Sequence, residues 1–98
     1  IANGENIVFV SAATVWEIVI KKAIGKLDLP DEFQEVLRQQ HFRYLDITSD
    51  HAFQIGKLPM HHRDPFDRMI VAQCQIEGLT LVTRDQNIKG YDVPILEA

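Results

Sequence analysis

The segment HHRDPFDRMIVAQCQIEGLTLVTRD, residues 61–85, predicts a helix followed by a buried strand. Asp64 precedes Pro65, and this pair is typical of a helix that begins with an aspartate N-cap and a proline in its first position. Gly78 predicts the end of that helix. Residues 79–83 are apolar and β-branched, and they predict a parallel strand buried on both faces.

Two carboxylates are expected at one edge of the sheet. Asp67 is the third residue of the helix, near the positive end of its dipole, and Asp85 follows the strand. Ligands of open α/β sheets gather at the carboxyl ends of the strands, and if the preceding helix starts at the same edge, Asp67 lies near Asp85. Neighbouring carboxylates repel each other, and Mg²⁺ is often held by such groups together with water and phosphate. Taken singly, Asp64 is explained as a cap, Asp67 as a first-turn acid and Asp85 as a turn residue.

The composition is that of an ordinary globular protein. With 98 residues, 46% hydrophobic and 24% charged, the chain is long enough for one domain with a modest core. It has no apolar run long enough to cross a bilayer and no signal peptide, so we expect no membrane association. The single cysteine, Cys74, excludes an intramolecular disulfide, fits a reducing cytosol and is expected to pack in an apolar stripe with Phe66, Met69 and Ile70. The net charge of −4 argues against non-specific nucleic-acid binding by the whole surface.

The rest of the chain alternates between expected strands and helices. Ser11 is expected to cap the first of these helices and Asp31 the second. This alternation predicts an α/β fold with a mostly parallel sheet flanked by helices. The expected strands are 7–10, 42–47 and 93–96, the last at an edge because of its proline, and the expected helices are 12–24, 31–41 and 48–57.

Glu17 and Lys21 are four residues apart in the first expected helix. This spacing and order predict an ion pair on the helix surface. The apolar residues around them predict a wide face that packs against the sheet; they are Val15, Trp16, Ile18, Val19, Ala23 and Ile24.

Two separated motifs carry a resemblance to a known family. The first is Ser11…Trp16-Glu17-Ile18…Lys21…Gly25-Lys26-Leu27, and the second is His62-Arg63-Asp64-Pro65-Phe66-Asp67-Arg68…Ala72-Gln73…Thr83-Arg84-Asp85. With both motifs in this order, the chain resembles PIN-domain ribonucleases of the VapC toxin type, from about Ile7 to Leu96. The resemblance implies a PIN-like three-layer fold, with residues 1–98 as a single domain. It also implies a cytoplasmic toxin that hydrolyses RNA phosphodiesters with Mg²⁺ or Mn²⁺, a cognate antitoxin as partner, and a homodimer.

The resemblance also implies the roles of individual residues. Glu17, Asp67 and Asp85 match the family's catalytic and metal-binding acids, and Asp64 matches an accompanying acid. The candidate substrate-binding residues are Lys21, Arg68, Thr83 and Arg84. The basic residues are expected either to contact phosphate or simply to be solvated, and Thr83 either to hold a water or a carboxylate or to be a plain strand-end residue. For His61 and His62, a plain loop position and a role as substrate contact or general acid both stay open.

One departure from the family pattern affects the expected activity. Family members begin with a strand that carries a further metal-binding aspartate, followed by a helix, and neither precedes Ile7 in this sequence. We therefore expect the domain to be incomplete at its N-terminus, or its strands to pair differently within the chain or across a dimer. The alternative function is a catalytically impaired PIN domain that acts only in dimer and antitoxin interaction. A phosphoacceptor domain of the receiver type is a third reading, suggested by acids and Thr83 at strand ends.

Overall fold

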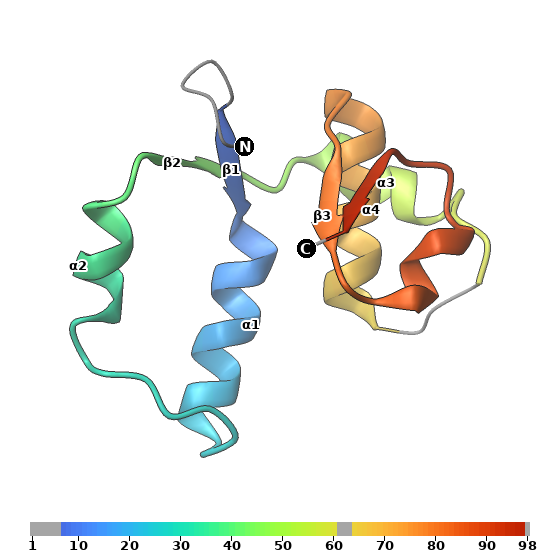
Figure 1. The fold of residues 1–98 in the computed structure, drawn as a ribbon. Coiled ribbons are helices and arrows are strands. Elements are labelled where there is room, and N and C mark those ends of the chain that lie inside the picture. The colour runs from blue at the N-terminus through green and yellow to red at the C-terminus, as the bar shows by residue number, and fades with distance from the viewer. Residues whose placement is uncertain (1–6, 61–63, 98) are drawn as a thin grey trace. The chain divides into compact units, whose positions relative to one another are not determined.

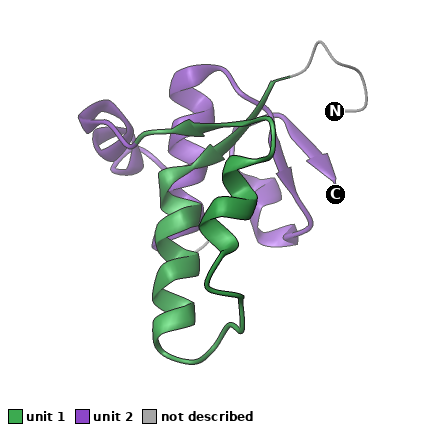
Figure 2. Ribbon diagram, turned by 90° about the vertical axis from the view of Figure 1, so that its left-hand side faces the viewer, with its two compact units in different colours: residues 1–46 green, residues 47–98 purple. Residues whose placement is uncertain are grey.

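The described residues of the computed structural model, 7–60 and 64–97, form helices interspersed with short strands (Figure 1). They fall into two compact units, Ile1–Asp46 and Ile47–Ala98, which Figure 2 colours separately. Each unit contains one pair of parallel strands accompanied by helices, so the predicted α/β class is confirmed. Within the described ranges the strands form two two-stranded sheets, where a single sheet was expected.

The first unit is built around the parallel pair of β1 (Val8–Ser11) and β2 (Phe42–Leu45). Two helices, α1 (Ala12–Ala23) and α2 (Phe33–Arg38), connect these strands. As predicted, Ser11 caps α1, because its hydroxyl accepts the backbone N–H of Ala13 at 3.0 Å. The strand-to-helix junction is therefore determined locally by one side chain.

The apolar face of α1 is more exposed than its sequence pattern suggests. Trp16, Val19 and Ile24 are 58%, 58% and 60% exposed, whereas Ala13 is buried. The prediction that this wide face packs against a sheet is therefore wrong for these three side chains. The spacing of apolar residues identifies an apolar face of a helix, but it does not show whether another part of the chain covers that face.

The prediction that Asp31 caps the second helix is also wrong. The N-cap of α2 is Glu32, which makes no side-chain capping hydrogen bond. The Asp31 carboxylate instead accepts the Lys22 ammonium at 2.9 Å and so ties the end of α1 to the loop before α2. The carboxylate of Asp31 thus binds the side chain of Lys22, nine residues away, and not a backbone N–H of the helix that follows it.

This ion pair has a measurable pH signature. The hydrogen bond from Lys22, together with its charge, holds the pKa of Asp31 below its ordinary value of 3.8. We expect Lys22→Met to raise the pKa of Asp31 toward that value, as measured by NMR titration of the carboxyl carbon between about pH 2 and pH 6. Because the folded-state pKa is lowered, the pair stabilises the fold above the unfolded pKa and loses this effect as the pH falls through the folded pKa. Lys26→Met is the control, and an unchanged pKa of Asp31 in Lys22→Met would contradict the pairing.

The second unit contains the main apolar core. Helix α3 (Ser49–Ile55) packs against α4 (Pro65–Glu77), and α4 contacts β3 (Leu81–Thr83). The 3₁₀ helix η1 (Gln86–Gly90) then leads to β4 (Ile95–Glu97), which pairs with β3 in parallel. The core residues are Leu58, Val71, Ala72, Ile88 and Tyr91, with Ile55, Leu81, Val93 and Ile95 packed against them.

Both ends of α4 are as predicted. The Asp64 carboxylate accepts the N–H groups of Phe66 at 2.8 Å and of Asp67 at 3.1 Å. At the other end, Gly78 adopts φ +68°, and its N–H donates to the carbonyl of Cys74. This left-handed conformation favours glycine, so the helix stops here for a backbone reason.

The buried face of α4 differs in detail from the predicted stripe. Val71 and Ala72 are fully buried and Cys74 is 6% exposed, whereas Phe66, Met69 and Ile70 are only partly buried. The expected packing role of Cys74 is thus confirmed, and the centre of the packed face lies nearer Val71. The buried face is centred on different residues from those predicted because α4 packs against both α3 and β3.

Helix α3 begins with a reciprocal capping arrangement. The N–H of His51 donates to the Thr48 hydroxyl at 3.2 Å, and the N–H of Thr48 donates to His51 Nδ1 at 3.0 Å. Histidine takes the place that glutamate or glutamine occupies in the usual capping box. The side chain of His51 is only 1% exposed, so this cap is also part of the packed interior.

Strand β4 is shorter and later than predicted. It covers Ile95–Glu97, whereas the sequence suggested residues 93–96. Pro94 still contributes to the pairing, because its carbonyl accepts the N–H of Leu81 at 2.9 Å. A proline lacks a donor but keeps its acceptor, which explains its place beside the ladder.

Candidate functional site

Asp67 and Asp85 lie at the same end of the second unit. Asp67 is in the first turn of α4, and Asp85 follows the carboxyl end of β3. Figure 1 shows β3 running alongside α4 in the opposite direction, so the start of the helix and the end of the strand are neighbours. Both side chains are partly buried. The arrangement of this unit therefore supports the expectation that the two acids share one rim.

The backbone after β3 is held by side chains of the candidate site. The Thr83 hydroxyl accepts the N–H of Asp85 at 3.0 Å. The Asp85 carboxylate in turn accepts the N–H of Asn87 at 2.9 Å and caps η1. Thr83 thus orients the segment that carries Asp85, while its predicted contact with substrate stays a prediction.

Glu17 belongs to α1 in the first unit. Its carboxylate lies 3.1 Å from the ammonium of Lys21, which confirms the predicted pair between residues four apart. The side chains are 22% and 49% exposed, respectively. Glu17 is the more enclosed partner, and the pair contributes only a few tenths of a kcal/mol to the helix.

Arg68 differs from the expected phosphate contact. Arg68 is only 9% exposed, and its guanidinium donates hydrogen bonds to the carbonyls of Pro59 at 3.0 Å and Ile55 at 3.2 Å. It also donates to the Tyr91 hydroxyl at 3.2 Å. These contacts give Arg68 a structural role, and the geometry does not favour the predicted role in substrate binding. Arg84, by contrast, is exposed.

The sequence pattern did not distinguish these two arginines. Arg68 follows Asp67 near the start of a helix and was predicted, like Arg84, to contact substrate. One feature of the sequence could have indicated that Arg68 is buried. It lies one helical turn before Ala72, on the side of α4 that packs in the core. An arginine at that position must either leave the core or find several acceptors inside it.

The described residues do not show a complete metal site. In the ranges 7–60 and 64–97, no group of three His, Cys, Asp or Glu side chains could hold a metal ion. Glu17 lies in the first unit, and Asp64, Asp67 and Asp85 lie in the second. His61 and His62 lie outside the described residues.

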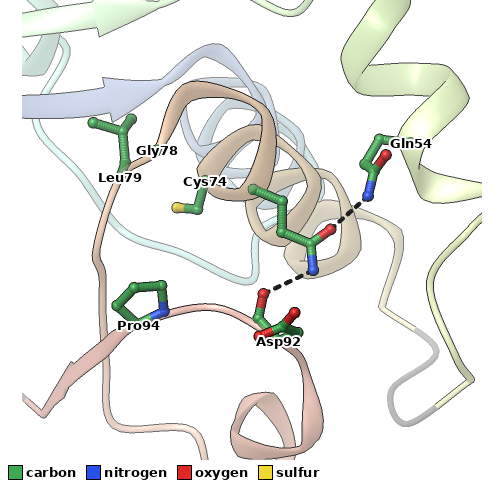
Figure 3. Close-up of a pocket in the computed structure, with 7 residues that line it drawn as sticks. Gln54, Cys74, Gly78, Leu79, Asp92 and Pro94 are labelled. Atoms are coloured by element: carbon green, nitrogen blue, oxygen red, sulfur yellow. Dashed lines mark hydrogen bonds between the residues drawn. The ribbon is translucent and has the colours of Figure 1, made fainter.

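A hollow at the opposite end of α4 contains none of the predicted site residues. It has a volume of about 400 Å³ and is bounded by the segment around Gly78 (Figure 3). The Gln54 amide donates to the Gln75 carbonyl oxygen at 2.7 Å, and the Gln75 amide donates to the backbone carbonyl of Asp92 at 2.9 Å. The amides on this wall are therefore used to join α3, α4 and the segment before β4.

Cys74 lines this hollow, but its thiol is a poor nucleophile. Burial raises its pKa to about 11. The thiolate is the reactive form, so at pH 8 we expect Cys74 to react with a disulfide reagent roughly 100-fold more slowly in the native protein than in urea. Stopped-flow absorbance measures this ratio, with free cysteine in the same urea concentrations as the control. A native rate within about tenfold of the unfolded rate would contradict the burial of this thiol.

The fold and the rim define the class as an α/β protein with parallel strands and carboxylates at a helix start and a strand end. The PIN domain model matches residues 1–94, and the chain belongs to the PIN domain family. The chain is similar in structure to a chain of the crystal structure of VapBC2 from Rickettsia felis bound to a DNA fragment from their promoter. The TM-score is 0.73 with 17% sequence identity, over 94% of this chain and 75% of that chain. At this identity the likeness concerns the fold.

No curated protein sequence matches the chain. Among the described residues, no helix has the length and apolar character needed to span a bilayer.

Proposed function

We propose that this chain is the ribonuclease toxin of a toxin–antitoxin module and that it hydrolyses RNA phosphodiesters in the cytoplasm. The proposal assigns catalysis and metal binding to Glu17, Asp67 and Asp85, with Mg²⁺ or Mn²⁺ as cofactor. Lys21, Thr83 and Arg84 remain the proposed contacts to the RNA. The cognate antitoxin and a second copy of the chain are its proposed protein partners.

The observation that supports the proposal most strongly is the common rim of Asp67 and Asp85 in a chain of the PIN domain family. A partly buried carboxylate at a helix start and another after a parallel strand are placed where α/β proteins bind ligands. The structurally similar chain comes from a VapBC2 complex, which is the reason for proposing a toxin–antitoxin module here.

The experiment is cleavage of a fluorescent single-stranded RNA by the purified chain. We expect cleavage in Mg²⁺ or Mn²⁺, none in excess EDTA, and recovery when the metal is added back. Glu17→Gln is expected to lower the rate about 100-fold, because it removes a carboxylate charge while keeping the shape of the side chain. The matched control is Glu35→Gln, since Glu35 forms a similar helical pair with Arg38 at 3.5 Å. Absence of cleavage at every metal concentration would refute the enzyme proposal for this chain.

A second candidate function is a non-catalytic interaction module. The exposed apolar side chains of α1, including Trp16 and Val19, favour a surface that meets another protein. This function predicts that the chain forms a stable complex with its antitoxin but cleaves no RNA under any metal condition. Cleavage that is lost in Glu17→Gln and kept in Glu35→Gln would reject it.

A further inference from the structure

Arg68 is a buried cation held by neutral oxygens. One guanidinium nitrogen donates to the Pro59 carbonyl and the Tyr91 hydroxyl, and the other donates to the Ile55 carbonyl. The sulfur of Met60 lies 3.6 Å from the first of these nitrogens. Ion pairs among the described residues include none with Arg68. Burying a guanidinium without a carboxylate is costly unless its donors are well satisfied, so these contacts hold the side chain in one place.

The three acceptors come from two separate segments of the second unit, residues 55–59 and Tyr91. Ile55 is the last residue of α3, where a helix dipole favours positive charge. Pro59 belongs to the connection after α3, and Tyr91 follows η1. Tyr91 is itself 4% exposed and packs in the core. The guanidinium therefore joins the start of α4 to the end of α3 and to the end of η1.

One side of this junction is next to Asp67, and the other is linked to Asp85 through the five residues of η1. Arg68 directly follows Asp67 in the first turn of α4. Tyr91 directly follows η1, the short helix that Asp85 caps. A shift of Arg68 relative to Tyr91 would therefore change the place of Asp67 relative to Asp85.

We infer that Arg68 and Tyr91 form a buried latch that positions Asp67 against Asp85, so that Arg68 is a positioning residue of the site. This inference rests on the proposed function for its effect on catalysis. The latch itself concerns the geometry of the second unit. It also explains why an arginine beside the rim is turned into the core.

The test compares Tyr91→Phe with Tyr44→Phe. The first change removes the hydroxyl that accepts from Arg68 and keeps the ring. The second makes the same chemical change at an exposed tyrosine of β2. We expect Tyr91→Phe to move the amide NMR resonances of Asp67 and Asn87 and Tyr44→Phe to leave them in place. Arg68→Lys is expected to move the same resonances further, because a single ammonium nitrogen cannot reach acceptors that two separate guanidinium nitrogens contact.

The catalytic readout separates positioning from RNA binding. We expect Tyr91→Phe to lower kcat about tenfold and to leave KM within about twofold, at a temperature where circular dichroism shows the variant to be folded. An unchanged kcat, or a raised KM with kcat retained, would overturn the positioning role. Unmoved resonances at Asp67 and Asn87 would overturn the latch. If the unmodified chain does not cleave RNA, the proposed function fails, and the resonances alone decide whether the latch exists.

Discussion

Asp67→Asn is expected to lower the rate of RNA cleavage about 1,000-fold while the protein stays folded. The change removes one carboxylate charge from the rim and preserves the size of the side chain. A loss of several kcal/mol of transition-state stabilisation corresponds to a rate change of this order. The folding cost is small, since a first-turn acid contributes only about 0.3–1 kcal/mol through the helix dipole.

Asp64→Asn is the control for this prediction, because it makes the same chemical change one turn earlier. Asp64 uses its carboxylate to accept two backbone N–H groups of α4. Asparagine is an equally good N-cap, so we expect stability to be kept and cleavage to stay within about tenfold. Circular dichroism and initial rates at saturating RNA measure the two properties. Equal loss of cleavage in both variants would show that the assignment to Asp67 is not specific.

His51→Ala is expected to have the largest effect on stability, lowering the free energy of unfolding of the second unit by about 3 kcal/mol. The change removes a fully buried ring and the acceptor of the Thr48 N–H. A lost cap costs about 1 kcal/mol, and emptying a buried site adds a cavity term of about 2 kcal/mol or more. In the neutral ring Nδ1 accepts, so Nε2 carries the proton. Among the described residues Nε2 has no hydrogen-bond partner, and it lies 3.8 Å from the Glu77 carboxylate.

His51→Gln separates the two contributions. Glutamine at this position can accept the Thr48 N–H as in an ordinary capping box, so we expect about half of the loss to be recovered. His41→Ala, at an exposed histidine, is expected to change stability by no more than about 0.5 kcal/mol. Native-state hydrogen exchange at the amides of Val71 and Ala72 is the appropriate measurement, because Trp16 fluorescence reports on the other unit. A change below about 1 kcal/mol in His51→Ala would refute the role of this ring.

Local signals allowed several elements to be predicted from the sequence. Ser11, Asp64 and Gly78 act through hydrogen bonds or backbone angles within a few residues, and each was placed correctly. The Glu17–Lys21 pair is equally local and was also confirmed. Such features depend on spacing alone and do not need the rest of the fold.

Features that depend on distant partners could not be predicted in the same way. Asp31 was expected to cap a helix, but Lys22 engages its carboxylate. Arg68 was expected to contact substrate, but Tyr91 and two carbonyls provide acceptors inside the unit. The division of the strands into two parallel pairs likewise follows from long-range pairing. The convergence of Glu17 with Asp67 and Asp85 stays a prediction for the same reason.

The residues that cap the two ends of α4 affect how well this helix tolerates mutation. Asp64 and Pro65 specify where the helix begins, and Gly78 specifies where it stops. Asp67 lies three residues after Asp64, so exchanges at Val71 or Ala72, further along α4 than Arg68, can alter packing without displacing the carboxylate along the helix axis. An engineer could therefore redesign the buried side of this helix around Val71 and Ala72, keep Arg68, and retain the proposed site at its start.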